Sequence, residues 1–146
     1  MPNFFRAVVL LAVIGHQNRL VNAVTCFKCW SGDQQAILQF QLLEPELYGD
    51  VEYNERCSEE NQMAVVEVSE CPAGKCFARR LEDADNQPLT VRNCYAGPKW
   101  KRDRWRVKTP NYTIWDYGCA SNNCNFPSVE WLKEGYADGT EGPNGS

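Results

Sequence analysis

The sequence has 146 residues, eight cysteines, a single histidine and a formal net charge of −4. This length fits one ordinary domain. The only histidine, His16, lies in an N-terminal apolar segment, so the remainder offers no histidine base and no Ser-His or Cys-His pair. The composition therefore argues against an enzyme, and we predict no catalytic residue.

Residues 1–23 have the pattern of a secretory signal peptide. Arg6 precedes an apolar run at residues 7–14, and a more polar stretch ends with small apolar residues at Val21 and Ala23. A charged start, a short apolar core and a small-residue exit are typical of such a signal, and the run is too short to span a bilayer. We expect cleavage after Ala23 and a secreted, extracellular product.

The first part of the remaining chain is predicted to contain two short strands. Residues 24–30 alternate β-branched or aromatic residues with polar ones. A long cysteine-free loop follows at residues 30–56, and inside it three apolar residues alternate with glutamines. Alternation of this kind indicates a strand, although Ile37 and Leu43 break it and leave a helix open. The alternating residues, which also form a candidate apolar contact patch if they do not pack on the sheet, are Leu38, Phe40 and Leu42.

The second part is predicted to be strands joined by tight turns. Residues 62–71 are rich in β-branched residues and indicate a strand. Residues 76–81 and 89–95 read as the two strands of a hairpin, because the segment between them is acidic and rich in turn residues. We expect residues 127–146 to be a polar, flexible tail, in which "VEWLKEG" is either a helical turn or loose chain.

All eight cysteines follow the predicted cleavage site. An even number of cysteines in a small exported domain indicates a disulfide framework, with 105 pairings open from spacing alone. Cys26 and Cys29 also have the spacing of a redox pair, but that site requires a βαβ unit that the sequence does not show. An oxidising compartment argues against zinc held by thiolates. We therefore predict no metal and no cofactor.

Charge is distributed unevenly along the chain. Removal of the signal leaves a net charge of −6, residues 99–108 contribute +5, and the rest of the chain carries −11. In an extended strand, one face would carry Trp100, Arg102, Arg104 and Arg106, and the other would carry Lys101 and Trp105. The predicted partner-binding residues are Lys99, Trp100, Lys101, Arg102, Arg104, Trp105, Arg106 and Lys108.

Such a basic, tryptophan-containing segment fits an acidic receptor face, a sulfated glycan or an anionic lipid. The alternative is a solvated strand whose tryptophans cover the hairpin. Export from the cell argues against nucleic acid as the partner. Asn111 begins the tripeptide Asn-Tyr-Thr, which is an N-glycosylation acceptor in an exported protein.

Three motifs together resemble a known family. They are C-x-x-C at residues 26–29, "VRNC" at residues 91–94, and C-x4-C-N at residues 119–125. Their order and their positions near the two ends resemble the lymphocyte-antigen-six / urokinase-receptor superfamily, whose members have the snake-toxin-like three-finger fold. The resemblance implies a small, disulfide-rich, all-β three-finger domain of short antiparallel strands at residues 24–126.

The resemblance also implies specific structural roles. Asn125 is expected to be buried and bonded to the backbone of neighbouring strands. Gly118 stands where the family usually has a cysteine, which implies an eight-cysteine variant whose third finger lacks its own bridge. The first finger, at residues 30–56, is unusually long. The implied disulfides are Cys26–Cys76, Cys29–Cys57, Cys71–Cys94 and Cys119–Cys124.

By the same resemblance, the expected function is non-enzymatic protein binding that modulates a membrane receptor or an ion channel. The alternative is a cell-surface adhesion or junction-assembly factor, or a factor for the maturation of membrane proteins. Attachment to the outer leaflet by a GPI anchor is a second expectation for localisation. It would require a hydrophobic tail beyond the small residues 144–146.

Overall fold

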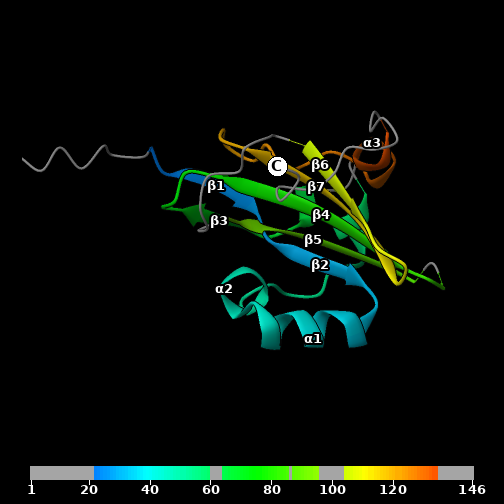
Figure 1. Cartoon of the computed structure of the whole chain (residues 1–146). Helices are drawn as coiled ribbons and strands as arrows, with labels where there is room; N and C mark the ends of the chain where they lie inside the picture. Colours follow the sequence, from blue (N-terminus) through cyan, green and yellow to red (C-terminus); the bar gives the residue numbers. More distant parts are fainter. Residues whose placement is uncertain (1–21, 60–63, 86, 96–103, 135–146) are drawn as a thin grey trace, which may run out of the picture.

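The computed structural model describes residues 22–59, 64–85, 87–95 and 104–134 (Figure 1). Within these ranges the chain forms two antiparallel sheets and a few short helices, which confirms a small, disulfide-rich, all-β domain. The strands are β1 (Val24–Phe27), β2 (Cys29–Gly32), β3 (Val68–Cys71), β4 (Cys76–Asp83), β5 (Pro88–Cys94), β6 (Arg104–Lys108) and β7 (Tyr112–Cys119). The helices are α1 (Gln34–Leu43), α2 (Pro45–Tyr48), the 3-10 helix η1 (Glu55–Ser58) and α3 (Val129–Lys133).

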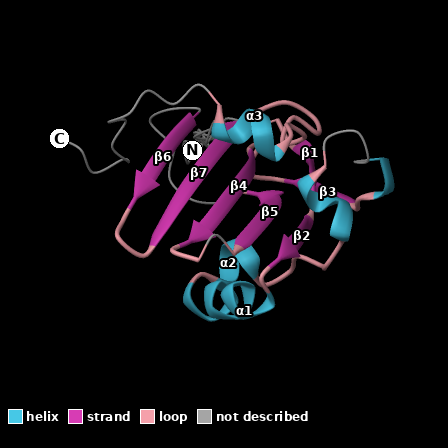
Figure 2. Cartoon of the chain, turned by 90° about the vertical axis from the view of Figure 1, so that its right-hand side faces the viewer, coloured by secondary structure: helices cyan, strands magenta, loops and turns pink. Residues whose placement is uncertain are grey.

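The larger sheet has the strand order β2-β5-β4-β7-β6, which Figure 2 shows side by side, and the smaller one pairs β1 with β3. The predicted hairpin is present as β4 and β5, with Cys76 opposite Cys94 at its base. At its turn, the Asp83 carboxylate accepts the backbone N–H groups of Asp85 and Gln87. Strands β6 and β7 form a second hairpin that pairs along β4.

The two faces of the five-stranded sheet are covered differently, because alternate residues of each strand point to opposite sides. Helices α1 and α2 cover one side. The core on that side contains Phe77, Leu81, Leu89 and Val91 from the sheet, packed with Ile37, Tyr48 and Val51 from the long first loop. The opposite side carries the other set, Ala78, Arg80, Thr90, Arg92 and Trp115, and α3 lies across it.

The prediction of a strand at residues 38–42 is wrong, because this segment is helix α1. Gly32 has a φ of 110°, which turns the chain out of β2, and Asp33 then caps the helix by accepting the N–H groups of Gln35 and Ala36. The apolar residues follow a helical period instead of a strand period. As a result, Ile37 is buried and Phe40 packs against the core, whereas Leu38 and Leu42 are exposed.

Two predicted boundaries also change. The strand expected over residues 62–71 begins only at Val68. The packed chain continues beyond residue 126, where the tail was predicted to begin, because α3 buries Val129 and Leu132 against the sheet. Ser128 caps α3 by accepting the N–H of Trp131. Residues 1–21 of the predicted signal peptide, the basic residues 99–102 and residues 135–146 lie outside the described residues.

We predict that Gly32→Ala destabilises the fold. The positive φ disfavours any side chain, and an added Cβ would lie 2.0 Å from the carbonyl oxygen of Pro88. Strain of this kind costs about 1–3 kcal/mol before the clash is counted. Urea unfolding of the oxidised protein measures the change, and Gln35→Ala on the exposed side of α1 serves as the control. A change for Gly32→Ala within about 0.5 kcal/mol would show that the turn is not constrained.

Candidate functional site

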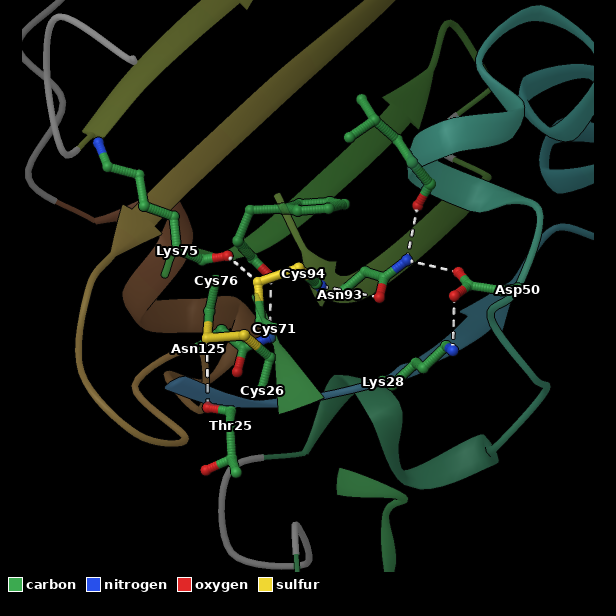
Figure 3. Close-up of a disulfide and its surroundings, with 12 residues drawn as sticks. Thr25, Cys26, Lys28, Asp50, Cys71, Lys75, Cys76, Asn93, Cys94 and Asn125 are labelled. Carbon is green, nitrogen blue, oxygen red and sulfur yellow. Dashed lines mark hydrogen bonds and ion pairs between the residues drawn. A yellow bond between two sulfur atoms is a disulfide. The ribbon is translucent and has the colours of Figure 1, made fainter. Parts of the chain in front are cut away.

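The base of the two hairpins is a knot of disulfides. The structure contains Cys26–Cys76, Cys29–Cys57, Cys71–Cys94 and Cys119–Cys124, which are the four pairs that the resemblance implies. Figure 3 shows the Cys26–Cys76 bridge beside Cys71 and Cys94, at the point where both sheets meet. Every cysteine is in a bridge, so the reduced redox pair considered for Cys26 and Cys29 is not present.

Asn125 joins the two sheets beside this knot (Figure 3). Its side chain is fully buried. The Oδ1 atom accepts the N–H of Phe27 at 3.0 Å, and Nδ2 donates to the carbonyl oxygens of Phe27 at 2.9 Å and Phe77 at 3.0 Å. One side chain therefore satisfies three backbone groups of β1 and β4, of which the Phe77 carbonyl is fully buried. This is the role that the resemblance implies for Asn125.

We predict that Asn125→Ala destabilises the protein by about 3 kcal/mol or more, because it leaves three backbone groups without their partner. Asn122→Ala is a matched control in the same loop, since Asn122 makes one exposed bond, from the N–H of Thr25 to its Oδ1. The control should lose no more than about 1 kcal/mol. Guanidinium unfolding with all four bridges intact compares the two variants, and equal losses would contradict the prediction.

The residues between Val91 and Cys94 hold the loops to the sheet, a role that the sequence did not reveal. Arg92 is fully buried and donates to the carbonyl oxygens of Cys57 at 2.6 Å, Asn125 at 2.5 Å and Pro127 at 2.8 Å. It thereby fixes η1 and the segment leading to α3 on one side of β5.

Asn93 points to the other side of β5 and holds the loop after α2. Its Nδ2 donates to the Leu47 carbonyl and to the Asp50 carboxylate, both at 2.9 Å, and Lys28 lies 2.6 Å from the other Asp50 oxygen (Figure 3). Burial alone would raise the pKa of Asp50, but the bonds from Lys28 and Asn93 hold that pKa below its ordinary value. The long first loop is therefore tied to the sheet at Asp50.

A buried ion pair holds the middle of the β6–β7 hairpin against β4. Arg79 donates from Nε and Nη2 to the two carboxylate oxygens of Asp116, at 2.6 and 2.8 Å, and its Nη1 bonds the hydroxyl of Tyr48. Asp116 raises the pKa of Arg79, although burial acts to lower it, and burial raises the pKa of Tyr48 to about 12. The bidentate geometry fixes β7, β4 and α2 relative to one another.

The predicted basic segment is only partly described. Lys99, Trp100, Lys101 and Arg102 lie outside the described residues. Strand β6 carries the remainder, with Arg104, Arg106 and Lys108 opposite Tyr117, Trp115 and Thr113, all on the side of the sheet that α3 crosses. Trp105 lies on the other side and is buried, as expected of a tryptophan that covers the hairpin.

Arg104 differs from its basic neighbours because it holds α3. Its guanidinium lies 3.9 Å from the ring centroid of Trp131 and donates to the carbonyl oxygens of Trp131, at 2.7 Å, and of Glu134. Tyr117 packs against the same tryptophan, with its ring centroid 5.0 Å from that of Trp131. Arg104 is therefore a structural residue that holds α3, and not the partner-binding residue that the sequence predicts.

Further cations lie on the same side of the sheet, three of them beside Trp115. We call Arg80, Arg106, Lys108 and Lys133 the cationic face. Trp115 is paired with Arg80 and Arg106 on the neighbouring strands, and the Lys133 ammonium lies 5.2 Å from its ring centroid. Glu82 lies among them and contacts Arg80 at 3.1 Å and Lys133 at 2.9 Å. Lys108, which is exposed, lies near the turn of the hairpin.

Glu82 also makes the attachment of α3 sensitive to acid. Burial alone would raise the pKa of Glu82, but bonds from Lys133 and Arg80 hold that pKa below its ordinary value. The depressed pKa means that Glu82 stabilises the fold above the pKa of an unfolded glutamate, about 4.3, and that this stabilisation is lost as pH falls.

We therefore predict that Glu82→Gln is less stable than the natural protein by about 1–2 kcal/mol at pH 7. The difference should shrink as the pH falls from about 5 to about 3. Urea unfolding at several pH values measures it, with Glu70→Gln on exposed β3 as the control. A difference that does not depend on pH would contradict the role of the carboxylate.

The turn of the β6–β7 hairpin carries the predicted glycosylation acceptor. Asn111 is exposed, and the turn around it is closed by Thr109, whose N–H and hydroxyl both donate to the Tyr112 carbonyl. Among the described residues, no group of three or more His, Cys, Asp or Glu side chains could hold a metal ion. Nor do the described segments include a helix that is long and apolar enough to cross a membrane.

Comparison with known proteins gives no relative. No family model, no curated protein and no solved structure matches the chain.

Proposed function

We propose that the protein is an extracellular, non-enzymatic binding module that modulates a membrane receptor or an ion channel. The observation that carries this proposal is the cationic face in a chain of net charge −4. Two of its members, Arg106 and Lys108, stand on the firmly held β6–β7 hairpin, and Arg80 and Lys133 come from β4 and α3. Its two exposed lysines, Lys108 and Lys133, suit an acidic protein surface. Residence outside the cell, either secreted or held by a lipid anchor, belongs to the same proposal.

The β6–β7 hairpin is held in place before any partner binds, as a preorganised binding surface requires. The knot of disulfides fixes its base, the Arg79–Asp116 pair fixes its middle, and Arg104 holds α3 over its inner part. A partner therefore does not have to order this segment on binding, which reduces the entropic cost of association. Opposite charge on the partner would in addition speed the encounter.

Membership of the lymphocyte-antigen-six / urokinase-receptor superfamily is part of the proposal. It is supported by the four disulfide pairs, by the two hairpins β4–β5 and β6–β7, and by the contacts of Asn125. The first loop, with α1 and α2 in place of a hairpin, departs from the family pattern.

A second candidate function, as an adhesion, junction-assembly or maturation factor, is favoured by one observation. The chain presents an uncharged, leucine-bearing surface on α1, at the opposite side of the molecule from α3 (Figures 1 and 2). Two separate surfaces suit a protein that joins others together.

The proposed function is tested with the double variant Arg106→Glu and Lys108→Glu, which leaves the structural Arg104 in place. Fluorescently labelled protein is measured by flow cytometry on cells that display a panel of receptor and channel ectodomains. We expect saturable, salt-sensitive binding that is at least about tenfold weaker for the variant. The matched control reverses two exposed acidic residues elsewhere, Glu46→Lys and Glu59→Lys, and should bind at least as well as the natural protein.

Three results would contradict the proposal. The first is unchanged binding by the Arg106→Glu and Lys108→Glu variant when its thermal unfolding is also unchanged. The second is binding that survives trypsin treatment of the cells, which would indicate a lipid. The third is binding lost after heparinase treatment, which would indicate a sulfated glycan.

A further inference from the structure

Tyr53 is the most exposed tyrosine among the described residues. Its side chain belongs to a residue that is 61% exposed, whereas Tyr48 is fully buried and Tyr95 is 9% exposed. Tyr112 is 40% exposed, and Tyr117 is partly buried. Of these five tyrosines, Tyr53 is the one that a modifying enzyme reaches most readily.

The backbone presents Tyr53 on the outer edge of the larger sheet. Trp30 in β2 donates its N–H to the Glu52 carbonyl and accepts the N–H of Asn54, both at 2.8 Å. These bonds use the groups on either side of Tyr53, so its own N–H and C=O point away from β2. Neither these two groups nor the Tyr53 hydroxyl has a hydrogen-bond partner among the described residues.

The ring of Tyr53 is held in place without being covered. It makes an edge-to-face contact with Trp30, with the ring centroids 4.9 Å apart and the planes at 66°. Trp30 in turn packs against the core below α1 and α2. Tyr53 is therefore an ordered side chain on the surface and not part of a loose tail.

Carboxylates flank Tyr53 on both sides. Asp50 and Glu52 precede it, Glu55 follows two residues later, and all three are exposed. Residues 50–59 contain four carboxylates and one arginine, a net charge of −3. Tyr112, the next most exposed tyrosine, has no acidic residue within three positions. The two tyrosines thus differ in their charged surroundings as well as in their exposure.

An exposed tyrosine among carboxylates suits the enzymes that transfer a sulfuryl group. Their donor is an anhydride of sulfate and a nucleoside phosphate, which carries several negative charges, so cations must line the site that holds it. Such a cationic site attracts a tyrosine that is bordered by carboxylates more strongly than one that is not.

We propose that Tyr53 is a sulfation site of this protein. The phenol oxygen attacks the sulfur of the donor, an O–S bond forms, and the bond from sulfur to the oxygen of the donor's phosphate breaks. The phosphate leaves as an anion, and the phenol proton passes to a base of the transferase. No atom is oxidised or reduced. The proposal rests on the residence outside the cell that belongs to the proposed function, because this modification takes place on the export route.

The product adds one negative charge at the acidic edge of the molecule. Tyr53 lies beside β2, and β6, which carries Arg106 and Lys108 of the cationic face, is at the opposite edge of the same sheet (Figure 2). Sulfation therefore increases the separation of charge between the two edges. A more polarised molecule orients an approaching charged partner more strongly.

Mass spectrometry of the exported full chain tests the proposal. The chain is expressed in animal cells, and the protein recovered from the medium or the cell surface is reduced and digested with trypsin. The peptide of residues 29–56 contains two tyrosines, the buried Tyr48 and Tyr53, which fragmentation separates. We expect one added SO₃ group on Tyr53, which resists phosphatase and is absent from cells grown in chlorate, an inhibitor of donor synthesis.

A pair of tyrosine variants identifies the modified residue. Tyr53→Phe keeps the ring beside Trp30 and should lose the added group. Tyr112→Phe removes the other largely exposed tyrosine and should keep the group on Tyr53. Thermal unfolding with all four bridges intact confirms that each variant is folded.

A pair of carboxylate variants tests the recognition. Glu52→Gln with Glu55→Gln should lower the sulfated fraction of Tyr53 at least about fivefold, because the cationic site loses its two nearest partners. The matched control is Glu44→Gln with Glu46→Gln, which neutralises two exposed carboxylates before residue 50 and should leave that fraction unchanged.

Every other outcome would overturn the inference. Exported protein without SO₃ on Tyr53, or with a group that phosphatase removes, excludes the site, and an equal sulfated fraction in the two glutamine variants excludes recognition through the flanking carboxylates. These results leave the binding proposal intact, since the Arg106→Glu and Lys108→Glu variant should be sulfated normally. A chain found neither in the medium nor on the cell surface would overturn both proposals.

Discussion

The structure depends on two buried polar side chains, Asn125 and Arg92, that together satisfy backbone groups of four separate segments. Asn125 bonds β1 and β4, and Arg92 bonds η1 and two residues of the chain that leads to α3. In a domain this small, a hydrophobic core alone gives little stability, and buried backbone groups without partners would be costly. The short Cys119–Cys124 bridge adds little chain entropy, but it holds the loop that delivers Asn125 to this junction.

The two sides of the five-stranded sheet carry different kinds of side chain. Alternation along β4, β5 and β7 sends apolar residues such as Phe77 and Val91 toward α1 and α2, and sends Arg80 and Trp115 to the opposite side. Hairpin β6–β7 has a glycine, Gly118, where the resemblance would place a bridged cysteine. The Arg79–Asp116 pair and the packing of Arg104 on Trp131 hold this hairpin in place. A buried bidentate pair of this kind fixes geometry more than it adds stability.

Part of the fold could be predicted from alternation and turn residues, which marked the β4–β5 hairpin between two apolar runs. The disulfide pairing was left open by spacing and was implied only by the family resemblance. The first loop could not be predicted, because Leu38, Phe40 and Leu42 alternate with glutamines as in a strand. The signals that decide it are local, a glycine at 32 that tolerates a positive φ and an aspartate at 33 that caps the helix. The roles of Arg92 and Asn93 were also hidden, since their partners are backbone groups far away in the sequence.

The same reasoning explains why the basic segment was only partly understood from its sequence. A run of cations interleaved with tryptophans looks like one continuous binding surface, yet its members have different tasks. Trp105 points to the covered side, Arg104 is committed to α3, and Arg106 and Lys108 remain on the side with Trp115. Alternation assigns residues to two faces of a strand, but only tertiary contacts show which of them a neighbouring element already uses. Here the element was α3, a helix of five residues within a segment whose composition suggested a flexible tail.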